Sequence, residues 1–209
     1  MSCIDKCTIN YNFLIFNYTE VFQNLLIRSL IEKSEDLGAM NLCGNNCECK
    51  LGTIEYVHGS LSSPPIIFGV NDPEQIRQLI HRPNPEMSQI LVKPYANRTL
   101  SPMRFNRCID TIKQSDVICT YGMSLGQTDA LWWKEILNLL SENKNSNLII
   151  HYWEPRCDEA VAGDVIQTIK DCKRRFITNA QSDVRTQRSL KDRMHVIINQ
   201  NPFHIVMHA

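Results

Sequence analysis

Phe13-Leu14-Ile15-Phe16-Asn17-Tyr18-Thr19 is the stretch of the chain that decides its fold class. The apolar and aromatic residues over 12–16 predict a short buried strand. A second strand is predicted over 53–57, directly before His58-Gly59-Ser60. Because α/β sheets hold their functional side chains at the carboxyl ends of strands, we expect Asn17 and His58 to converge on one crevice.

A third strand, predicted over residues 116–120, runs into a turn that contains Gly122, Ser124 and Gly126 before a helix begins. A strand, a glycine-bearing turn and a helix in this order can present free backbone N–H groups to an anion. Two glycines are a weaker pattern than a full Gly-x-Gly-x-x-Gly motif. An ordinary turn capped by Thr128 or Asp129 is therefore an equal alternative.

Strands and helices alternate along the chain, which predicts an α/β fold with a mostly parallel sheet flanked by helices. A length of 209 residues suits one domain over 1–209. Trp132 and Trp133 are expected in its core rather than against a cofactor. Long irregular segments are expected at 34–50 and 81–97. Further strands are predicted over 65–69, 148–153 and 196–198, and helices over 20–33, 73–80, 102–114, 129–140 and 158–193.

Charge and hydropathy exclude several classes of partner. Lysine plus arginine number 22, as do aspartate plus glutamate, so no overall field attracts nucleic acid. No apolar run reaches the roughly 18 residues of a membrane span, and no secretion signal opens the chain, so we expect a cytoplasmic protein that does not enter the membrane. The odd number of cysteines, nine, favours reduced thiols over a disulfide framework.

Three of the cysteines, Cys43, Cys47 and Cys49, form a cluster in a segment rich in glycine and asparagine. Their spacing lacks the paired Cys-x-x-Cys pattern of common zinc sites. We interpret the cluster as a thiol-bearing surface loop and predict no metal. The alternative is a structural zinc site whose fourth ligand comes from Cys3, Cys7 or His58.

Four segments, in this order, resemble the AbiH family of bacteriophage abortive-infection proteins: residues 16–19, 57–60, 67–69 and 121–129. The same succession of turns is similar to the nucleotide-binding core of sirtuins. The resemblance covers residues 12–153 and leaves 154–209 as an extension of helix and strand. It implies a Rossmann-like sheet, a role in antiphage defence, and NAD or a related nucleotide as substrate or ligand.

One departure from these families concerns the start of the chain. AbiH proteins open with a glycine-rich strand-loop-helix of the Gly-Asn-Gly-Phe-Asp kind, whereas this sequence passes almost directly into the strand before Asn17. Such a loop lets the backbone approach a pyrophosphate closely. We therefore expect a sheet that is incomplete at its N-terminus, as in the carboxyl-terminal part of a longer protein or a decayed copy.

The resemblance also implies a mechanism. Releasing nicotinamide from NAD breaks a glycosidic C–N bond through a cationic ribosyl transition state. His58 would serve as general base because an imidazole titrates near neutral pH. By the resemblance, Asn17 would orient the ribose or an attacking water, and the ligand would be bound by Gly59, Ser60, Gly122 and Ser124. A purely structural histidine at position 58 and an Asx-turn at position 17 are the alternatives.

Three functions are compatible with these residues. The first is an antiphage enzyme that cleaves NAD or a related nucleotide. The second is a non-catalytic sensor of a nucleotide or a phage protein, whose ligand binding would survive the loss of His58. The third is a truncated, inactive fragment, recognisable by an exposed apolar sheet edge. A nucleotide is the expected ligand in the first two cases, with a phage component and self-association left open.

Overall fold

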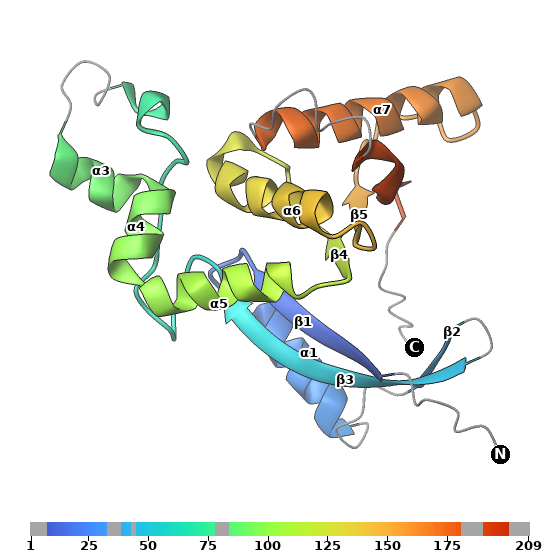
Figure 1. Cartoon of the computed structure of the whole chain (residues 1–209), viewed down its shortest axis with the longest axis horizontal. Coiled ribbons are helices and arrows are strands. Elements are labelled where there is room, and N and C mark those ends of the chain that lie inside the picture. The colour runs from blue at the N-terminus through green and yellow to red at the C-terminus, as the bar shows by residue number, and fades with distance from the viewer. Residues whose placement is uncertain (1–7, 33–38, 43–44, 78–83, 181–189, 201–209) are drawn as a thin grey trace. The chain divides into compact units, whose positions relative to one another are not determined.

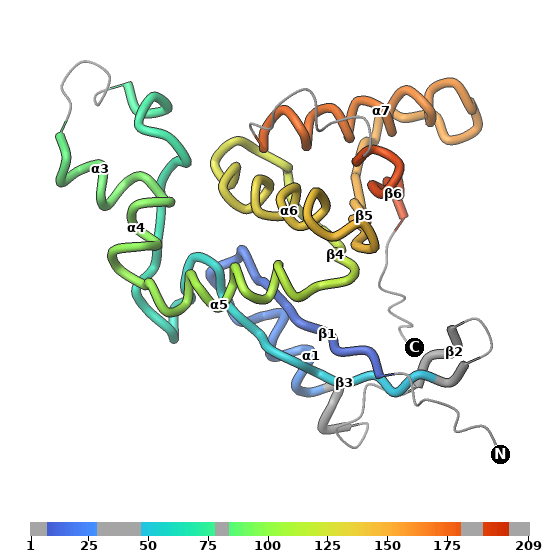
Figure 2. Tube along the Cα trace, in the orientation of Figure 1, coloured from blue at the N-terminus to red at the C-terminus, as the bar shows by residue number. Residues whose placement is uncertain are grey.

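The computed structural model describes residues 8–32, 39–42, 45–77, 84–180 and 190–200. It is an α/β protein, as predicted, whose chain packs as two compact units (Figures 1 and 2). Unit 1 consists of Met1–Phe68 and Ala96–Cys108, and unit 2 of Gly69–Tyr95 and Ile109–Ala209. The prediction of a single domain stays a prediction, and each unit is described by itself below. None of the described helices is long and apolar enough to cross a membrane.

Unit 1 contains a three-stranded sheet in the order β1-β3-β2. Strand β1 (Thr8–Ile15) pairs in parallel with β3 (Asn45–Tyr56), and β2 (Ala39–Leu42) pairs with β3 in the antiparallel direction. Helix α1 (Val21–Glu32) follows β1, and the rings of Phe13 and Phe22 lie 5.1 Å apart between them. The predicted strands before Asn17 and His58 are therefore confirmed, and both begin earlier than predicted.

The prediction of a long irregular loop over 34–50 is wrong for its described part, which forms β2 and the start of β3. Cys47 and Cys49 are 1% and 4% exposed, whereas Glu48 and Lys50 are exposed. Residues two apart on a strand share one face, so the two thiols enter the core while the charged neighbours face solvent. Two of the three clustered cysteines therefore lie on an alternating strand rather than in a surface loop, and Cys43 lies outside the described residues.

Unit 2 contains a second sheet, entirely parallel and in the order β4-β5-β6. Its strands are β4 (Val117–Thr120), β5 (Asn147–Tyr152) and β6 (Met194–Ile198), all three as predicted. Helices α6 (Ala130–Glu142) and α7 (Ala162–Asn179) contact each other, and α7 contacts β6. Trp132 and Trp133 are each 1% exposed, and Trp133 packs on Phe176 at 5.5 Å, which confirms the core prediction.

Helix α5 (Pro102–Lys113) is confirmed, but the irregular excursion predicted over 81–97 is wrong for its described residues. They form α3 (Pro85–Leu91) and the first part of α4 (Lys93–Leu100). Pro85 and Pro94, two of the prolines that suggested irregularity, stand in first helical turns, where a missing N–H has no cost. Asn84 caps α3 by accepting the N–H of Met87 at 3.1 Å.

The strand predicted over 65–69 and the helix predicted over 158–193 differ from the structure, and the helix predicted over 73–80 is described only in part. Residues 65–69 form no strand. Prolines lack the N–H that strand pairing needs. A single main-chain hydrogen bond, from Ile67 N–H to the His58 carbonyl at 2.8 Å, links this segment to the His58 turn. Asp72 forms the predicted cap, and the short 3₁₀ turn η1 (Pro73–Gln75) follows it. Arg77 is again helical, and because residues 78–83 lie outside the described residues, the extent of this helix stays a prediction. The helix predicted over 158–193 is in fact the shorter α7. Residues 181–189 lie outside the described residues, and η4 (Lys191–Arg193) comes after them.

Candidate functional site

The turns that carry Asn17 and His58 lie side by side in unit 1. They leave the neighbouring parallel strands β1 and β3, in which Ile15 pairs with Tyr56. Two main-chain hydrogen bonds then join the turns, from Val57 N–H to the Ile15 carbonyl at 2.9 Å and from Leu61 N–H to the Tyr18 carbonyl at 3.1 Å. The structure thus brings together the two strand ends that the sequence singled out.

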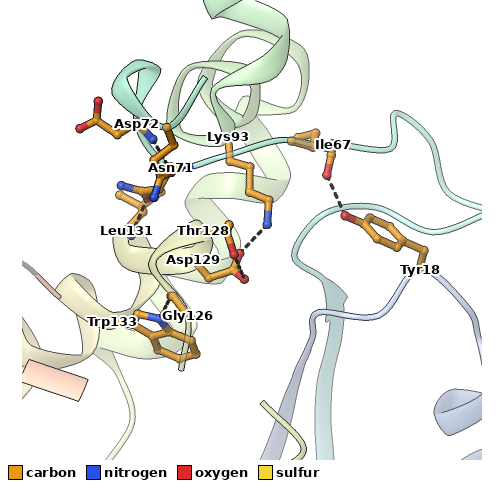
Figure 3. Close-up of polar contacts among 11 residues, drawn as sticks. Tyr18, Ile67, Asn71, Asp72, Lys93, Gly126, Thr128, Asp129, Leu131 and Trp133 are labelled. Carbon is orange, nitrogen blue, oxygen red and sulfur yellow. Dashed lines mark hydrogen bonds and ion pairs between the residues drawn. The ribbon is translucent and has the colours of Figure 1, made fainter. Parts of the chain in front are cut away.

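The His58 side chain is enclosed by aromatic rings and is 2% exposed. Phe16 meets it edge to face, with ring centroids 5.5 Å apart and an interplanar angle of 82°, and Tyr18 lies 6.3 Å away. Figure 3 shows that the Tyr18 hydroxyl donates to the carbonyl of Ile67 at 3.2 Å. Asn17, by contrast, is exposed. A ligand can reach the exposed Asn17 amide directly, but it can reach the buried His58 ring only if surrounding groups move.

Gly59 and Ser60 use their backbone donors within the turn. The N–H of Gly59 donates to the Tyr56 carbonyl at 2.9 Å, and the N–H of Ser60 to the Ser63 carbonyl at 3.2 Å. Gly59 has φ +78°, in the left-handed region, and a Cβ there would lie 2.3 Å from the Pro65 carbonyl oxygen. The turn therefore requires glycine for its own shape.

Glu20 is a residue of this site that the sequence analysis missed. Its carboxylate accepts hydrogen bonds from the backbone N–H and the hydroxyl of Ser62, at 3.1 and 2.5 Å. Hydrogen bonds from Ser60 and Ser62 lower the pKa of this carboxyl group. Glu20 therefore links the turn after β1 to the turn after β3. A glutamate that directly precedes a helix gives no sequence signal for a partner 42 residues away.

The second glycine-bearing turn follows β4 and belongs to unit 2. Gly122 has φ +66°, a Cβ added there would meet no atom within 4 Å, and Ser124 is exposed. Trp133 Nε1–H donates to the Gly126 carbonyl at 2.8 Å, and Asn179 Nδ2 donates to the Leu125 carbonyl at 2.6 Å. The turn is fixed from one end while Gly122 and Ser124 stay accessible.

Helix α6 follows the 3₁₀ turn η2 (Gln127–Asp129). The sequence offered Thr128 or Asp129 as the cap of this helix, but its start is stabilised by other residues. Neither side chain makes a capping hydrogen bond to this helix. Instead Asn71 Oδ1 accepts the N–H of Leu131 at 2.9 Å, and Asp129 forms an ion pair with Lys93 Nζ at 2.8 Å (Figure 3). The side chains of Lys93 and Asp129 are only 10% and 19% exposed. Lys93, a lysine early in a helix, would normally be expected in solvent.

The predicted site residues therefore fall into two groups. Asn17, His58, Gly59 and Ser60 lie in unit 1, and Gly122 and Ser124 lie in unit 2. A ligand site that uses both groups stays a prediction. A small surface cavity of about 200 Å³ in unit 2 contains none of these residues; Tyr152, Glu154, Arg156, Cys157, Asp164, Thr168 and Asp171 line it.

The alternative of a zinc site finds no support among the described residues. They contain no group of three or more metal-binding side chains that could hold an ion. Cys47 and Cys49 are buried free thiols on β3, and Cys3, Cys7 and Cys43 lie outside the described ranges.

Comparison with known proteins bears on these turns directly. The family model described as "Bacteriophage abortive infection AbiH" matches residues 3–152, which include both glycine-bearing turns and the Asn17 turn. The chain belongs to the AbiH family. The match supports a role in phage abortive infection. Neither a search of curated proteins nor a search of solved structures found a match, so the likeness of this AbiH protein to sirtuins stays a prediction.

Proposed function

We propose that this AbiH protein acts in abortive infection by binding a nucleotide, NAD in the first instance, at the paired turns of Asn17 and His58. In this proposal it cleaves the nucleotide, with His58 as general base. The observation that supports it best is the contact between the two turns, made by main-chain bonds and by the bonds from Ser62 to Glu20. Two polar side chains are thereby held at the carboxyl ends of two adjacent parallel strands, β1 and β3.

Proton abstraction requires the imidazole to come within hydrogen-bond reach of the ribose hydroxyl or of a water. His58 is 2% exposed, so the proposal includes a movement of Tyr18, whose hydroxyl donates to the Ile67 carbonyl at 3.2 Å and whose ring lies 4.7 Å from that of Phe68. Breaking this hydrogen bond costs about 1 kcal/mol, and the ring contact with Phe68 adds to the free energy that ligand binding must supply. The exposed Asn17 would orient the ribose, and Gly122 and Ser124 would contact phosphate. This activity would take place in the cytoplasm.

A second function, binding without turnover, is favoured by two specific observations. The His58 ring is enclosed, and the N–H groups of Gly59 and Ser60 already donate within the turn. A protein of this kind would sense a nucleotide or a phage component, alone or after self-association. His58 would then be a structural residue.

Chromatography of NAD incubated with purified protein separates the two functions. We expect the wild-type chain to release nicotinamide and His58→Ala to release none, at matched circular dichroism. His195→Ala is the matched control, because His195 is an exposed histidine on β6. If all three proteins leave NAD intact, hydrolysis of NAD is excluded for this chain. Calorimetric binding of NAD that persists in His58→Ala would then support the sensor.

A further inference from the structure

Arg104 lies in the first turn of α5 and is only 6% exposed. Its guanidinium donates from Nη1 to the Ser63 carbonyl at 3.2 Å and from Nη2 to the Pro65 carbonyl at 2.6 Å. Both acceptors belong to the segment that follows the His58 turn, and all of these residues belong to unit 1. One planar side chain therefore binds two carbonyls of this segment at the same time.

The environment of Arg104 is unusual for a cation. No carboxylate binds it in the described part of the chain, and its Nε–H is buried without an acceptor there. The nearby Glu55 binds Arg107 instead, at 2.5 and 3.1 Å. Burial lowers the pKa of Arg104 below its usual value. A buried cation that two carbonyl groups alone compensate is costly, and an apolar side chain would serve packing alone better.

The contacts of Arg104 lead to His58 by two short routes. In the first, Arg104 holds the carbonyl of Pro65, and the N–H of Ile67, two residues later, donates to the His58 carbonyl at 2.8 Å. In the second, Arg104 lies against Gly59, since a Cβ at Gly59 would lie 3.0 Å from Arg104 Nη1. Both routes reach the peptide group between His58 and Gly59, so one guanidinium holds the main chain directly after the His58 side chain.

We infer that Arg104 is a positioning residue that sets the place of the His58 imidazole between the rings of Phe16 and Tyr18. Lysine cannot replace it, because an ammonium group lacks the rigid fork that fixes two carbonyls in one plane. The consequence of this role for catalysis rests on the proposed function. The position of the His58 ring does not, and it can be measured separately.

The test uses the full chain with isotope-labelled histidine, in which the His58 signals are assigned by comparison with His58→Asn. The edge-to-face contact with Phe16 shifts the ring protons of His58 away from the values of an exposed histidine. We expect Arg104→Lys and Arg104→Met to move these signals by at least 0.2 ppm towards those values. The circular dichroism spectrum of Arg104→Lys should stay native.

Arg107→Met is the matched control, one helical turn further along α5, where the side chain is 53% exposed. It removes the same charge and should leave the His58 signals in place. Unchanged His58 signals in Arg104→Lys would overturn the inference, as would an equal change in Arg107→Met. Should Arg104→Met fail to fold, Arg104→Lys decides the question.

A kinetic measurement then connects the inference with the proposed function. If the wild-type chain hydrolyses NAD, Arg104→Lys should lower kcat at least tenfold with little change in KM, because it displaces the base and leaves the ligand contacts intact. If the wild-type chain leaves NAD intact, the proposed function fails while the resonance test of Arg104 still stands.

Discussion

The carboxylate of Glu20 accepts both the backbone N–H and the hydroxyl of Ser62, at 3.1 and 2.5 Å. This contact joins the turn after β1 to the turn after β3, on which the proposed site depends. Because the carboxylate must be ionised to accept both bonds well, the contact makes the site sensitive to acid.

Glu20→Gln should therefore destabilise unit 1 at neutral pH and have less effect in acid. The folded-state pKa of Glu20 lies below its usual value of 4.5, so its stabilisation is complete above that value and is lost as the pH falls through the folded pKa. The midpoint of urea unfolding should be lower in Glu20→Gln than in wild type at pH 7, and the difference should close towards pH 3. Glu142→Gln, at an exposed carboxylate on α6, is the control. A difference independent of pH would contradict this account.

Lys93→Met should destabilise unit 2 by about 2–3 kcal/mol, less than for a fully buried pair because both side chains keep some exposure. The loss leaves Asp129 largely buried beside no cation. Adding Asp129→Leu to the variant should recover part of the loss, and a double-mutant cycle in guanidinium chloride measures the coupling.

The surface pair Lys50 and Glu48, each 53% exposed, provides the comparison. Lys50→Met should change the free energy of unfolding by less than about 0.5 kcal/mol. Equal losses for the exposed and the shielded pair would show that burial does not govern the Lys93 contact.

Gly59→Ala should destabilise the protein far more than Gly122→Ala. Both glycines have positive φ, which costs an alanine roughly 1–2 kcal/mol. At Gly59 the added methyl also meets the Pro65 carbonyl oxygen at 2.3 Å, whereas the space at Gly122 is open. Thermal unfolding measures the difference, with Gly163→Ala on α7, where φ is helical and the space is open, as a control that should be neutral or stabilising.

Cys108 and Cys172 should react with iodoacetamide only when the protein unfolds. Burial raises the pKa of both thiols to about 12, so at pH 8 the thiolate fraction is about 10⁻⁴. Cys157, which is partly exposed, should react first among the three. Peptide mapping by mass spectrometry over time gives the order, and early labelling of Cys108 would indicate that the start of α5 opens in the native state.

The sequence was sufficient for elements that local pattern determines. The apolar run before Asn17, the strands at 117–120 and 147–152, and the two buried tryptophans all follow from hydrophobic patterning. Prediction from the sequence was wrong where local composition suggested irregular structure but the chain forms a regular strand or helix. Cys47 and Cys49, next to asparagines, suggested a loop but lie on strand β3. Pro85 and Pro94 suggested an irregular segment but stand at helix starts.

The contacts that shape the candidate site were hardest to foresee. Glu20, Lys93 and Arg104 are charged residues in or beside helices, where the pattern predicts solvent exposure. Their partners lie 42, 36 and about 40 residues away in sequence. Only the tertiary structure brings such pairs together, because no local propensity encodes them.

The two side-chain hydrogen bonds that hold the turn after β4 have a consequence for how the sequence of the protein can change. Trp133 and Asn179 hold the carbonyls of Gly126 and Leu125, while the side chains of Met123 and Ser124 take no part in these two bonds. Because these two side chains make neither of the hydrogen bonds that hold the turn, substituting them should cost little folding free energy. A ligand that binds a turn already held in this way loses little additional conformational entropy of the loop. If this loop contacts a ligand as proposed, substitution at these two positions would change that contact while the rest of the turn stays the same.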